Sequence, residues 1–271
     1  MFEGDQVDPV IEGRGARYTV DELRRQVEAL GPWFHDIDLG EGVRTAPNHP
    51  LGNFLEEIWA HVGRYLPEDL TGSTVLDIGC NAGFYSQQLR RRGATVLGID
   101  HDERYLAQAR FAAEVNGLDI EYRLMDTYDV DRLEQRFDYV LFMGVFYHLR
   151  YPLYALDKVA KLVGRRLVFQ SMVRGVGGTV PVPDDAPITE RAMFEHPRFP
   201  AMYFIEKRYA GDPTNWWVPN EAGMEAMLRS AGLRIVAHPF TELWICEPAT
   251  TTPSSEAPVR RGARSGPRPS G

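Results

Sequence analysis

The chain of 271 residues holds only two cysteines, Cys80 and Cys246, which are too few for a fold stapled by disulfides. It also has no apolar run near the ~20 residues that a bilayer-spanning helix needs. Residues 1–15 are acidic and contain glycine, so they do not follow the basic-then-apolar pattern of a secretory signal. These absences predict a cytoplasmic protein with reduced thiols and no membrane segment.

Positive charge is scarce as well, since 30 lysines and arginines face 38 acidic residues and leave a formal net charge of −8. Residues 249–271 contain four arginines and one glutamate, so residues 1–248 carry a formal charge of −11. A surface of this sign repels a phosphate backbone unless basic residues are concentrated locally. Nucleic acid is therefore a disfavoured partner, although tRNA stays open as an alternative.

Apolar segments of strand length alternate with segments of helix length through the middle of the chain. We predict strands at 73–78, 95–99, 120–125, 137–143 and 165–171, and helices at 83–92, 102–116 and 153–163. Strands spaced by such helices indicate a parallel, doubly wound sheet. Two more strands, 234–238 and 241–247, are so close that they must form an antiparallel hairpin. The predicted fold is α/β: a Rossmann-like, mostly parallel seven-stranded sheet with one antiparallel edge strand.

The order of predicted elements and the local composition divide the chain into three parts. Residues 1–70 form an N-terminal helical lid segment, with helices at 19–30 and 53–65, and the capping box of Thr19 and Glu22 starts the first. Residues 71–248 form the main domain, interrupted by a proline- and glycine-rich insertion at 173–219 that we expect to arch over the sheet edge. A helix from Asn220 to Ala231 follows it. The tail at 249–271 has the composition of a disordered segment.

The most informative motif places Asp77, Gly79, Asn81 and Gly83 between a predicted strand and a predicted helix. Such a turn brings backbone amides and a helix N-terminus against a ligand. Asparagine tolerates the left-handed backbone conformation better than most residues, so the turn is compatible with Asn81.

Asp100 ends the next predicted strand, 21 residues after Gly79, where a carboxylate accepts the hydroxyls of a ribose. Phe84 stands where a dinucleotide site has its last glycine, and it would crowd a pyrophosphate. The pair of motifs therefore favours S-adenosylmethionine (SAM), which has an adenosine and an amino-acid end, over a nicotinamide cofactor. The alternative to a SAM site is a strand–turn–helix that binds no nucleotide or nucleoside.

With this order of elements, residues 53–248 resemble the class I SAM-dependent methyltransferases. The resemblance implies that the glycine turn holds the methionine end of SAM and that Asp100 holds its ribose. Asp126, which ends the third strand, stands at the family's adenine-contacting position. The full set that the resemblance implies for the cofactor is Asp77, Gly79, Asn81, Gly83, Asp100, His101, Asp126, Thr127 and Met143.

A closer resemblance is to the tRNA wobble-uridine carboxymethyltransferase family and its uncharacterised bacterial relatives. It is carried by the run Met-Gly-Val-Phe-Tyr-His at 143–148 and by Pro152-Leu153 after it. The family has a longer, basic N-terminal extension, and its carboxylate-binding lysine matches no residue here. The fold and SAM therefore carry over, whereas the tRNA substrate and the carboxylated SAM do not.

His148 and Tyr147 are the predicted catalytic residues, because the end of the fourth strand faces the sulfonium in this architecture. Imidazole, with an ordinary pKa near 6.5, suits a general base at neutral pH. The competing interpretation is that His148 packs under the next helix and orients a loop. Tyr147 either hydrogen-bonds the methyl acceptor or lies along the methionine of SAM. No Asn/Asp-Pro-Pro-Tyr run occurs at this site, which disfavours methylation of amino groups.

The irregular segment 33–45 is expected to cover the pocket, and Trp33, His35 and Arg44 are its predicted substrate-binding residues. Trp216, in the late insertion, is a fourth, because it can stack on a sugar or an aromatic substrate. Packing of the N-terminal helix explains Trp33 equally well, and core filling explains Trp216. We predict no metal site, because His35 and its neighbouring aspartates lack a distant partner ligand.

Together these observations predict a SAM-dependent methyltransferase that transfers a methyl group to an oxygen on a small molecule or glycan precursor. A tRNA wobble-uridine modifying enzyme and a non-catalytic SAM-fold subunit remain the alternatives. The sequence gives no indication of the oligomeric state.

Overall fold

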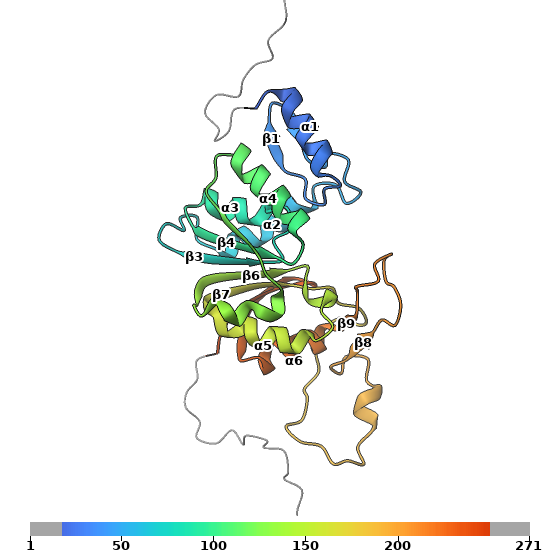
Figure 1. Ribbon diagram of the computed structural model, residues 1–271. Coiled ribbons are helices and arrows are strands. Elements are labelled where there is room, and N and C mark those ends of the chain that lie inside the picture. Colours follow the sequence, from blue (N-terminus) through green and yellow to red (C-terminus); the bar gives the residue numbers. More distant parts are fainter. Residues whose placement is uncertain (1–17, 250–271) are drawn as a thin grey trace, which may run out of the picture.

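The computed structural model describes residues 18–249 and contains a seven-stranded sheet with helices on both faces (Figure 1). The predicted tail beyond Ala249 and the first 17 residues of the predicted lid segment lie outside the described residues. The strands run in the order β10-β11-β7-β6-β3-β4-β5. Their bounds are β3 Thr74–Ile78, β4 Thr95–Asp100, β5 Glu121–Leu124, β6 Phe137–Met143, β7 Val163–Gln170, β10 Leu233–Phe240 and β11 Leu243–Pro248.

The strand directions confirm the predicted α/β fold. Strands β3 to β7 pair in parallel, and β11 is antiparallel to both of its neighbours, β7 and β10. The hairpin therefore closes the sheet at one edge, with β11 as its single reversed strand. The connections from β3 lead outward to β4 and β5, whereas β6 and β7 lie on its other side. Ligands of such sheets bind at this reversal, beyond the carboxyl ends of the strands.

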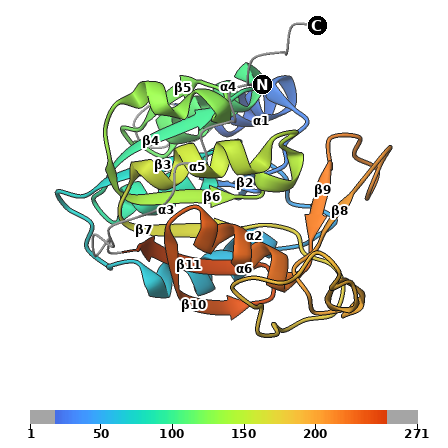
Figure 2. The same ribbon diagram turned by 90° about the horizontal axis from the view of Figure 1, so that it is seen from below.

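Helices cover both faces of the sheet and form two cores (Figures 1 and 2). Alternation along the strands separates them, because Val75 and Leu141 enter one core while Leu76 and Val140 enter the other. The first core takes α2 Phe54–Val62, α3 Phe84–Arg91 and α4 Glu103–Val115, with α1 Val20–Leu30 packed on α4. The second takes α5 Pro152–Leu162 and α6 Glu221–Ser230.

Two predicted helix caps are present. The Thr19 hydroxyl accepts from the amide of Glu22 at 3.3 Å, and the Glu22 carboxylate accepts from the amide of Thr19 at 2.8 Å. The Asn220 side chain accepts from the amide of Gly223 at 2.8 Å and so caps α6. Short 3-10 turns connect the longer elements: η1 Gly63–Tyr65, η2 Thr127–Leu133, η3 Phe146–His148 and η4 Ala192–Glu195.

The insertion contains structure that its composition did not predict. Strands β8 Met202–Phe204 and β9 Trp217–Pro219 pair antiparallel, and the segment between them folds back through a bridge of Tyr209 with Asp212. We call residues 202–219 the arm. It projects beyond the end of β6, beside η3 (Figure 2). A second small hairpin, β1 Asp38–Gly40 with β2 Val43–Arg44, forms within the N-terminal segment.

None of the helices within residues 18–249 combines the length and apolarity that a bilayer crossing requires.

Candidate active site

The glycine turn leaves β3 in the left-handed backbone region. Its φ angles are +69° at Gly79, +49° at Asn81 and +82° at Gly83. A Cβ atom at Gly79 would lie 2.2 Å from Cγ2 of Val145, and one at Gly83 would lie 2.4 Å from the hydroxyl of Tyr122. Gly79 and Gly83 must therefore be glycines for two reasons, the left-handed backbone conformation and the close packing of neighbouring side chains. The turn is consequently pressed against the loop that follows β6.

Asp100 lies at the tip of β4 with its carboxylate folded toward the glycine turn. One oxygen accepts from the amide of Asn81 and the other from the amide of Asp102, each at 3.0 Å. The side chain is 5% exposed, and burial raises the pKa of this carboxyl. A carboxylate has about four acceptor positions, so acceptor capacity remains for a sugar hydroxyl. The neighbouring His101 imidazole, largely exposed, lies 3.3 Å from Asp100 Oδ1.

Asp77 lies beneath the turn, only 3% exposed. Its carboxylate accepts a 2.6 Å hydrogen bond from the hydroxyl of Ser86, in the first turn of α3. Burial raises the pKa of Asp77 to about 6, and the nearby charge of Asp100 adds to this effect. The Asp77–Ser86 bond fastens α3 to the end of β3. A contact of Asp77 with the cofactor stays a prediction.

Three further predicted cofactor residues follow the neighbouring strands, and Asp126 among them is the one predicted to contact the adenine. Asp126 is exposed and caps η2 by accepting from the amide of Tyr128 at 2.8 Å, while Thr127 is buried beside it. Met143 ends β6 and is half-buried. All three lie at the carboxyl edge of the sheet, and contact with the cofactor stays a prediction for each.

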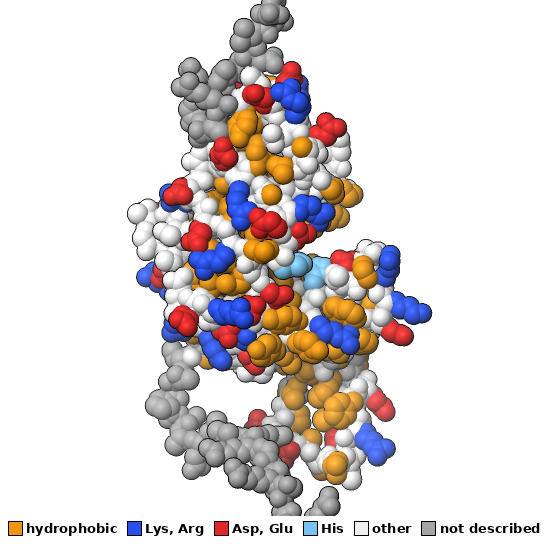
Figure 3. All heavy atoms as spheres, viewed as in Figure 1, with side chains coloured by type: hydrophobic (Ala, Val, Ile, Leu, Met, Phe, Trp, Pro, Cys, Tyr) orange, Lys and Arg blue, Asp and Glu red, His pale blue; other side chains and the backbone are white. Residues whose placement is uncertain are grey.

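Tyr147 and His148 form η3, directly after the loop that touches Gly79. Burial raises the pKa of Tyr147 to about 12. Burial also lowers the pKa of His148, and the charge of Asp212 opposes this change without cancelling it. The imidazole of His148 is therefore neutral near pH 7. Figure 3 shows histidine side chains, in pale blue, inside a notch of the surface beside the projecting arm.

The arm brings two residues to His148 that the sequence did not single out. Thr214 Oγ1 lies 2.9 Å from His148 Nδ1, and Asp212 Oδ2 lies 3.7 Å from the same nitrogen. The amide of Trp216 donates to the carbonyl of Tyr147 at 2.9 Å. The sequence Asp-Pro-Thr-Asn at 212–215 signals only a turn, because its 64-residue separation from His148 leaves no local pattern.

Trp216, a predicted substrate-binding residue, stacks its ring on Phe204 with an interplanar angle of 16°. The guanidinium of Arg150 lies over the Trp216 ring at 4.5 Å. Trp216 is half-buried, and its contact with substrate stays a prediction.

The other three predicted substrate-binding residues lie in the segment between α1 and α2. His35 is buried, its Nδ1 accepts from the amide of Phe84 at 3.3 Å, and burial lowers its pKa to about 3. Arg44 forms ion pairs with Asp36 at 2.7 Å and with Glu56 at 3.0 Å. The indole of Trp33 donates to a carbonyl of α1. The His35 contact joins the N-terminal segment to α3, whereas the contacts of Arg44 and Trp33 stay within that segment. Substrate contact stays a prediction for each residue.

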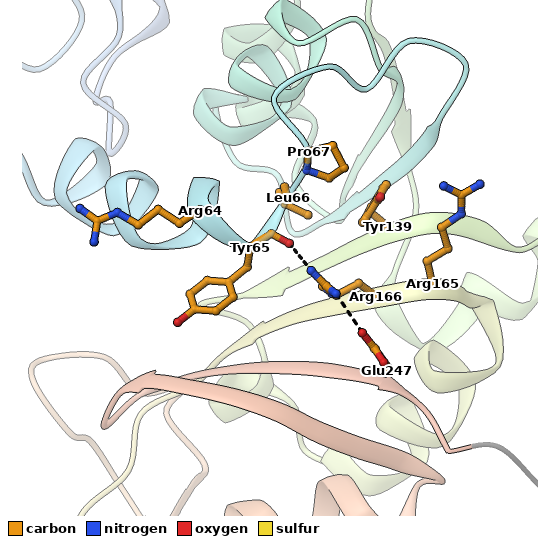
Figure 4. A pocket seen from close by; sticks show the side chains of 8 residues that line it. All are labelled: Arg64, Tyr65, Leu66, Pro67, Tyr139, Arg165, Arg166 and Glu247. Carbon is orange, nitrogen blue, oxygen red and sulfur yellow. Dashed lines mark hydrogen bonds and ion pairs between the residues drawn. The ribbon is translucent and has the colours of Figure 1, made fainter.

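A cavity of about 380 Å³ lies at the opposite edge, by the amino ends of the parallel strands (Figure 4). Arg166 bridges it by donating to the carbonyl of Tyr65 and to the carboxylate of Glu247. The cavity is far in the fold from the glycine turn, and its central cation is already paired. The lining residues are Arg64, Tyr65, Leu66, Pro67, Tyr139, Arg165, Arg166 and Glu247.

Comparison with known proteins shows similarity to methyltransferases. Residues 75–165 match a family described as a methyltransferase domain. The chain is 31% identical over 182 residues to a tRNA U34 carboxymethyltransferase of Pseudomonas paraeruginosa, covering 64% of this chain and 48% of that protein. It is 39% identical over 115 residues to a ubiquinone biosynthesis O-methyltransferase of Cereibacter sphaeroides, covering 42% of this chain and 47% of that protein. The chain thus spans about half the length of these curated relatives.

Among solved structures, the N-terminal domain of EvdMO1 with S-adenosylhomocysteine bound is similar, with a TM-score of 0.59 and 24% identity. The match covers 83% of this chain and 94% of that domain. This likeness supports the fold.

Proposed function

Because this chain carries a class I SAM-dependent methyltransferase domain, we propose that it binds SAM at the carboxyl edge of its sheet and methylates an oxygen of a small molecule or glycan precursor. One observation carries the proposal. Gly79 packs directly on Val145, so the cofactor turn and the loop leading to Tyr147 and His148 are in contact. A methyl donor bound by the turn would therefore lie next to a methyl acceptor bound beside η3.

The residues present fit this cofactor. At Gly79 and Gly83 a Cβ atom would collide with Val145 and Tyr122, so only glycine lets the turn keep this conformation, and the Asp100 carboxylate retains acceptor capacity for a ribose. Phe84, at the start of α3, leaves no close approach for a pyrophosphate, which SAM lacks. When bound, the cofactor supplies an electrophilic methyl carbon on a sulfonium. The protein's own part is to align that carbon with the acceptor and to take a proton.

Two buried polar side chains, one at the end of β7 and one in the arm beside His148, favour a polar acceptor. Ser171, which follows β7, and Asn215, in the arm, are 0% and 4% exposed, and one side-chain oxygen of each lacks a hydrogen-bond partner among the described residues. Buried oxygens without partners are costly, and hydroxyl groups of a ligand would satisfy them. The acidic balance of residues 1–248 also favours a small substrate over a polynucleotide.

Two measurements test the proposal. Calorimetry with S-adenosylhomocysteine tests the cofactor, and complete absence of binding by the wild-type chain would refute it. Transfer of labelled methyl from SAM to a panel of phenols, sugars and nucleotide sugars tests the acceptor. We expect transfer to at least one hydroxyl compound and its loss in the His148→Gln variant. Transfer to amines alone would contradict the oxygen acceptor.

Modification of tRNA is the second candidate, favoured by the 31% identity to a tRNA U34 carboxymethyltransferase over 182 residues. The shared run at 143–148 lies in the loop that carries the proposed base. Binding of bulk tRNA to the wild-type chain on filters, measured at 50 and 200 mM salt, decides between the candidates. Affinity that falls steeply with salt favours tRNA, and no retention at the lower salt excludes it.

A further inference from the structure

The arm is attached to the loop that carries His148 by main-chain and side-chain contacts. The amide of Trp216 donates to the carbonyl of Tyr147 at 2.9 Å, and the indole of Trp217 donates to the carbonyl of Arg150 at 3.2 Å. These two bonds flank His148 in the chain. The segment of the arm just before them, residues 212–215, is consequently held beside the imidazole.

The hydrogen bonds around Thr214 determine where its proton points. Asp212 Oδ1 lies 2.6 Å from Thr214 Oγ1 and 2.6 Å from the amide of Thr214. Burial opposes ionisation of Asp212, but the hydrogen bonds from Thr214 hold its pKa below the ordinary value. An ionised carboxylate only accepts, so the Thr214 hydroxyl must donate its proton to Asp212.

Because the Thr214 proton points to Asp212, the position of the hydrogen on the His148 ring is determined. A hydroxyl has one proton, so Thr214 Oγ1 can offer only a lone pair to His148 Nδ1, at 2.9 Å. Nδ1 must therefore carry the hydrogen of the neutral ring. The other nitrogen, Nε2, then keeps its lone pair.

We propose that Asp212 and Thr214 are positioning residues, which hold His148 in the Nδ1–H tautomer so that Nε2 takes the proton of the acceptor hydroxyl. This inference rests on the proposed methyltransferase function. In the step, the O–H proton passes to Nε2, and the acceptor oxygen forms the new bond to the methyl carbon. The bond from that carbon to sulfur breaks, and its electron pair stays on sulfur.

The positive charge that His148 gains in this step is offset by Asp212. The ring becomes an imidazolium, and the carboxylate of Asp212, 3.7 Å from Nδ1, stabilises its positive charge. His101 has the opposite effect to Asp212, because its positive charge disfavours the imidazolium and so lowers the pKa of His148. The His148 side chain is 34% exposed, so the proton can leave to solvent after transfer.

The first test reads the tautomer directly and needs no substrate. Nitrogen-15 NMR of imidazole-labelled full-length protein at pH 7.5 distinguishes protonated from unprotonated ring nitrogens, and His148→Gln identifies the signals of this residue. We expect Nδ1 protonated in the wild type and in Thr214→Ser, and a mixture of tautomers in Thr214→Val. A wild-type ring protonated on Nε2, or an unchanged tautomer in Thr214→Val, would overturn the proposal.

The second test measures catalysis with the acceptor found for the wild type. General bases contribute roughly 10²–10⁴-fold, so partial misplacement in Thr214→Val and Asp212→Asn should lower kcat by at least about 10-fold. The KM for SAM should stay within about 2-fold, and Thr214→Ser should restore kcat. Asp184→Asn, an exposed aspartate of the same insertion, is the matched control and should leave kcat unchanged.

The two tests separate this inference from the function on which it rests. If the wild type transfers no methyl group but shows the Nδ1–H tautomer, the methyltransferase proposal fails while the hydrogen-bond chain stands. If the wild type is active and Thr214→Val keeps its kcat, the positioning role fails and the function stands.

Discussion

The amide of Asn81 donates to the carboxylate of Asp100 at 3.0 Å and so ties the glycine turn to the tip of the neighbouring strand. The two residues are 19 positions apart, and Asn81 makes the bond from a left-handed conformation. A side chain proposed to hold a ribose is thus oriented by the turn proposed to hold the methionine. This hydrogen bond therefore couples the two halves of the proposed cofactor site.

Replacing Asp100 should weaken cofactor binding more than folding. In Asp100→Asn, one oxygen becomes an NH₂ group, which cannot accept from both amides and a ribose hydroxyl. Hydrogen bonds to charged groups contribute about 1.5–3 kcal/mol, so we expect S-adenosylhomocysteine to bind roughly 10- to 100-fold more weakly. Calorimetry measures the affinity. Asp119→Asn, on an exposed turn, serves as control, and equal affinities in both variants would contradict the role of Asp100.

Gly79→Ala should destabilise the protein more than an alanine at an unpacked glycine. The left-handed backbone alone costs about 1–2 kcal/mol, and a Cβ 2.2 Å from Val145 adds overpacking of about 1–3 kcal/mol. Gly72→Ala is the control, because its φ is +78° and nothing lies within 4 Å of its Cβ position. Urea unfolding gives both free energies.

The close contact itself can be isolated by adding Val145→Ala to both glycine variants. Truncation removes the atom that a Cβ at position 79 would strike, so the loss caused by Gly79→Ala should become similar to that of Gly72→Ala. A loss that stays equally large in the Val145→Ala background would show that the contact is not the cause.

The titration of Asp77 should make stability depend on pH. Its pKa is raised from 3.8 to about 6, so between these values the folded protein holds a proton that the unfolded chain has released. Folding is therefore favoured by this group at low pH, and the contribution is lost as pH rises from about 4 to 6. The loss amounts to at most about 3 kcal/mol.

Asp77→Asn tests this sign, because asparagine does not titrate and can still accept from Ser86. The free energy of unfolding of the wild type, relative to Asp77→Asn, should be higher at pH 4.5 than at pH 7. Chemical denaturation at both pH values provides the comparison. A difference of the opposite sign would mean that Asp77 is stabilised as a carboxylate.

The pKa of His148 should lie below that of an exposed histidine. Burial lowers it, while Asp212 opposes the change. Removing that negative charge in Asp212→Asn should lower the pKa further, since the imidazolium loses its stabilising partner. An NMR titration of His148 measures both values without any substrate. A wild-type value above 6.5, or an upward shift in Asp212→Asn, would contradict the structure.

The fold was predictable because it depends on local patterns. Apolar runs such as Val75–Ile78 and the glycine turn after it define a strand, a turn and a helix without distant information. The hairpin of β10 and β11 followed from the short distance between its strands. The capping residues Thr19 and Asn220 likewise marked the starts of their helices.

The arm was not predictable in this way. Strands β8 and β9 have three residues each, too few for an alternating pattern, and they pair across the loop from 205 to 216. Asp212 and Thr214 gain their significance only because the arm returns to His148. For His35, the sequence identified a residue worth attention but not the buried contact with Phe84.

The arm also has a consequence for how this enzyme could be redesigned. Residues 202–219 contain both Trp216, a predicted substrate-binding residue, and the pair proposed to orient the imidazole. Replacing this loop by another would change both the substrate preference and the proton transfer to His148. An engineer who wants a new acceptor must therefore carry the Asp-x-Thr spacing into the transplant.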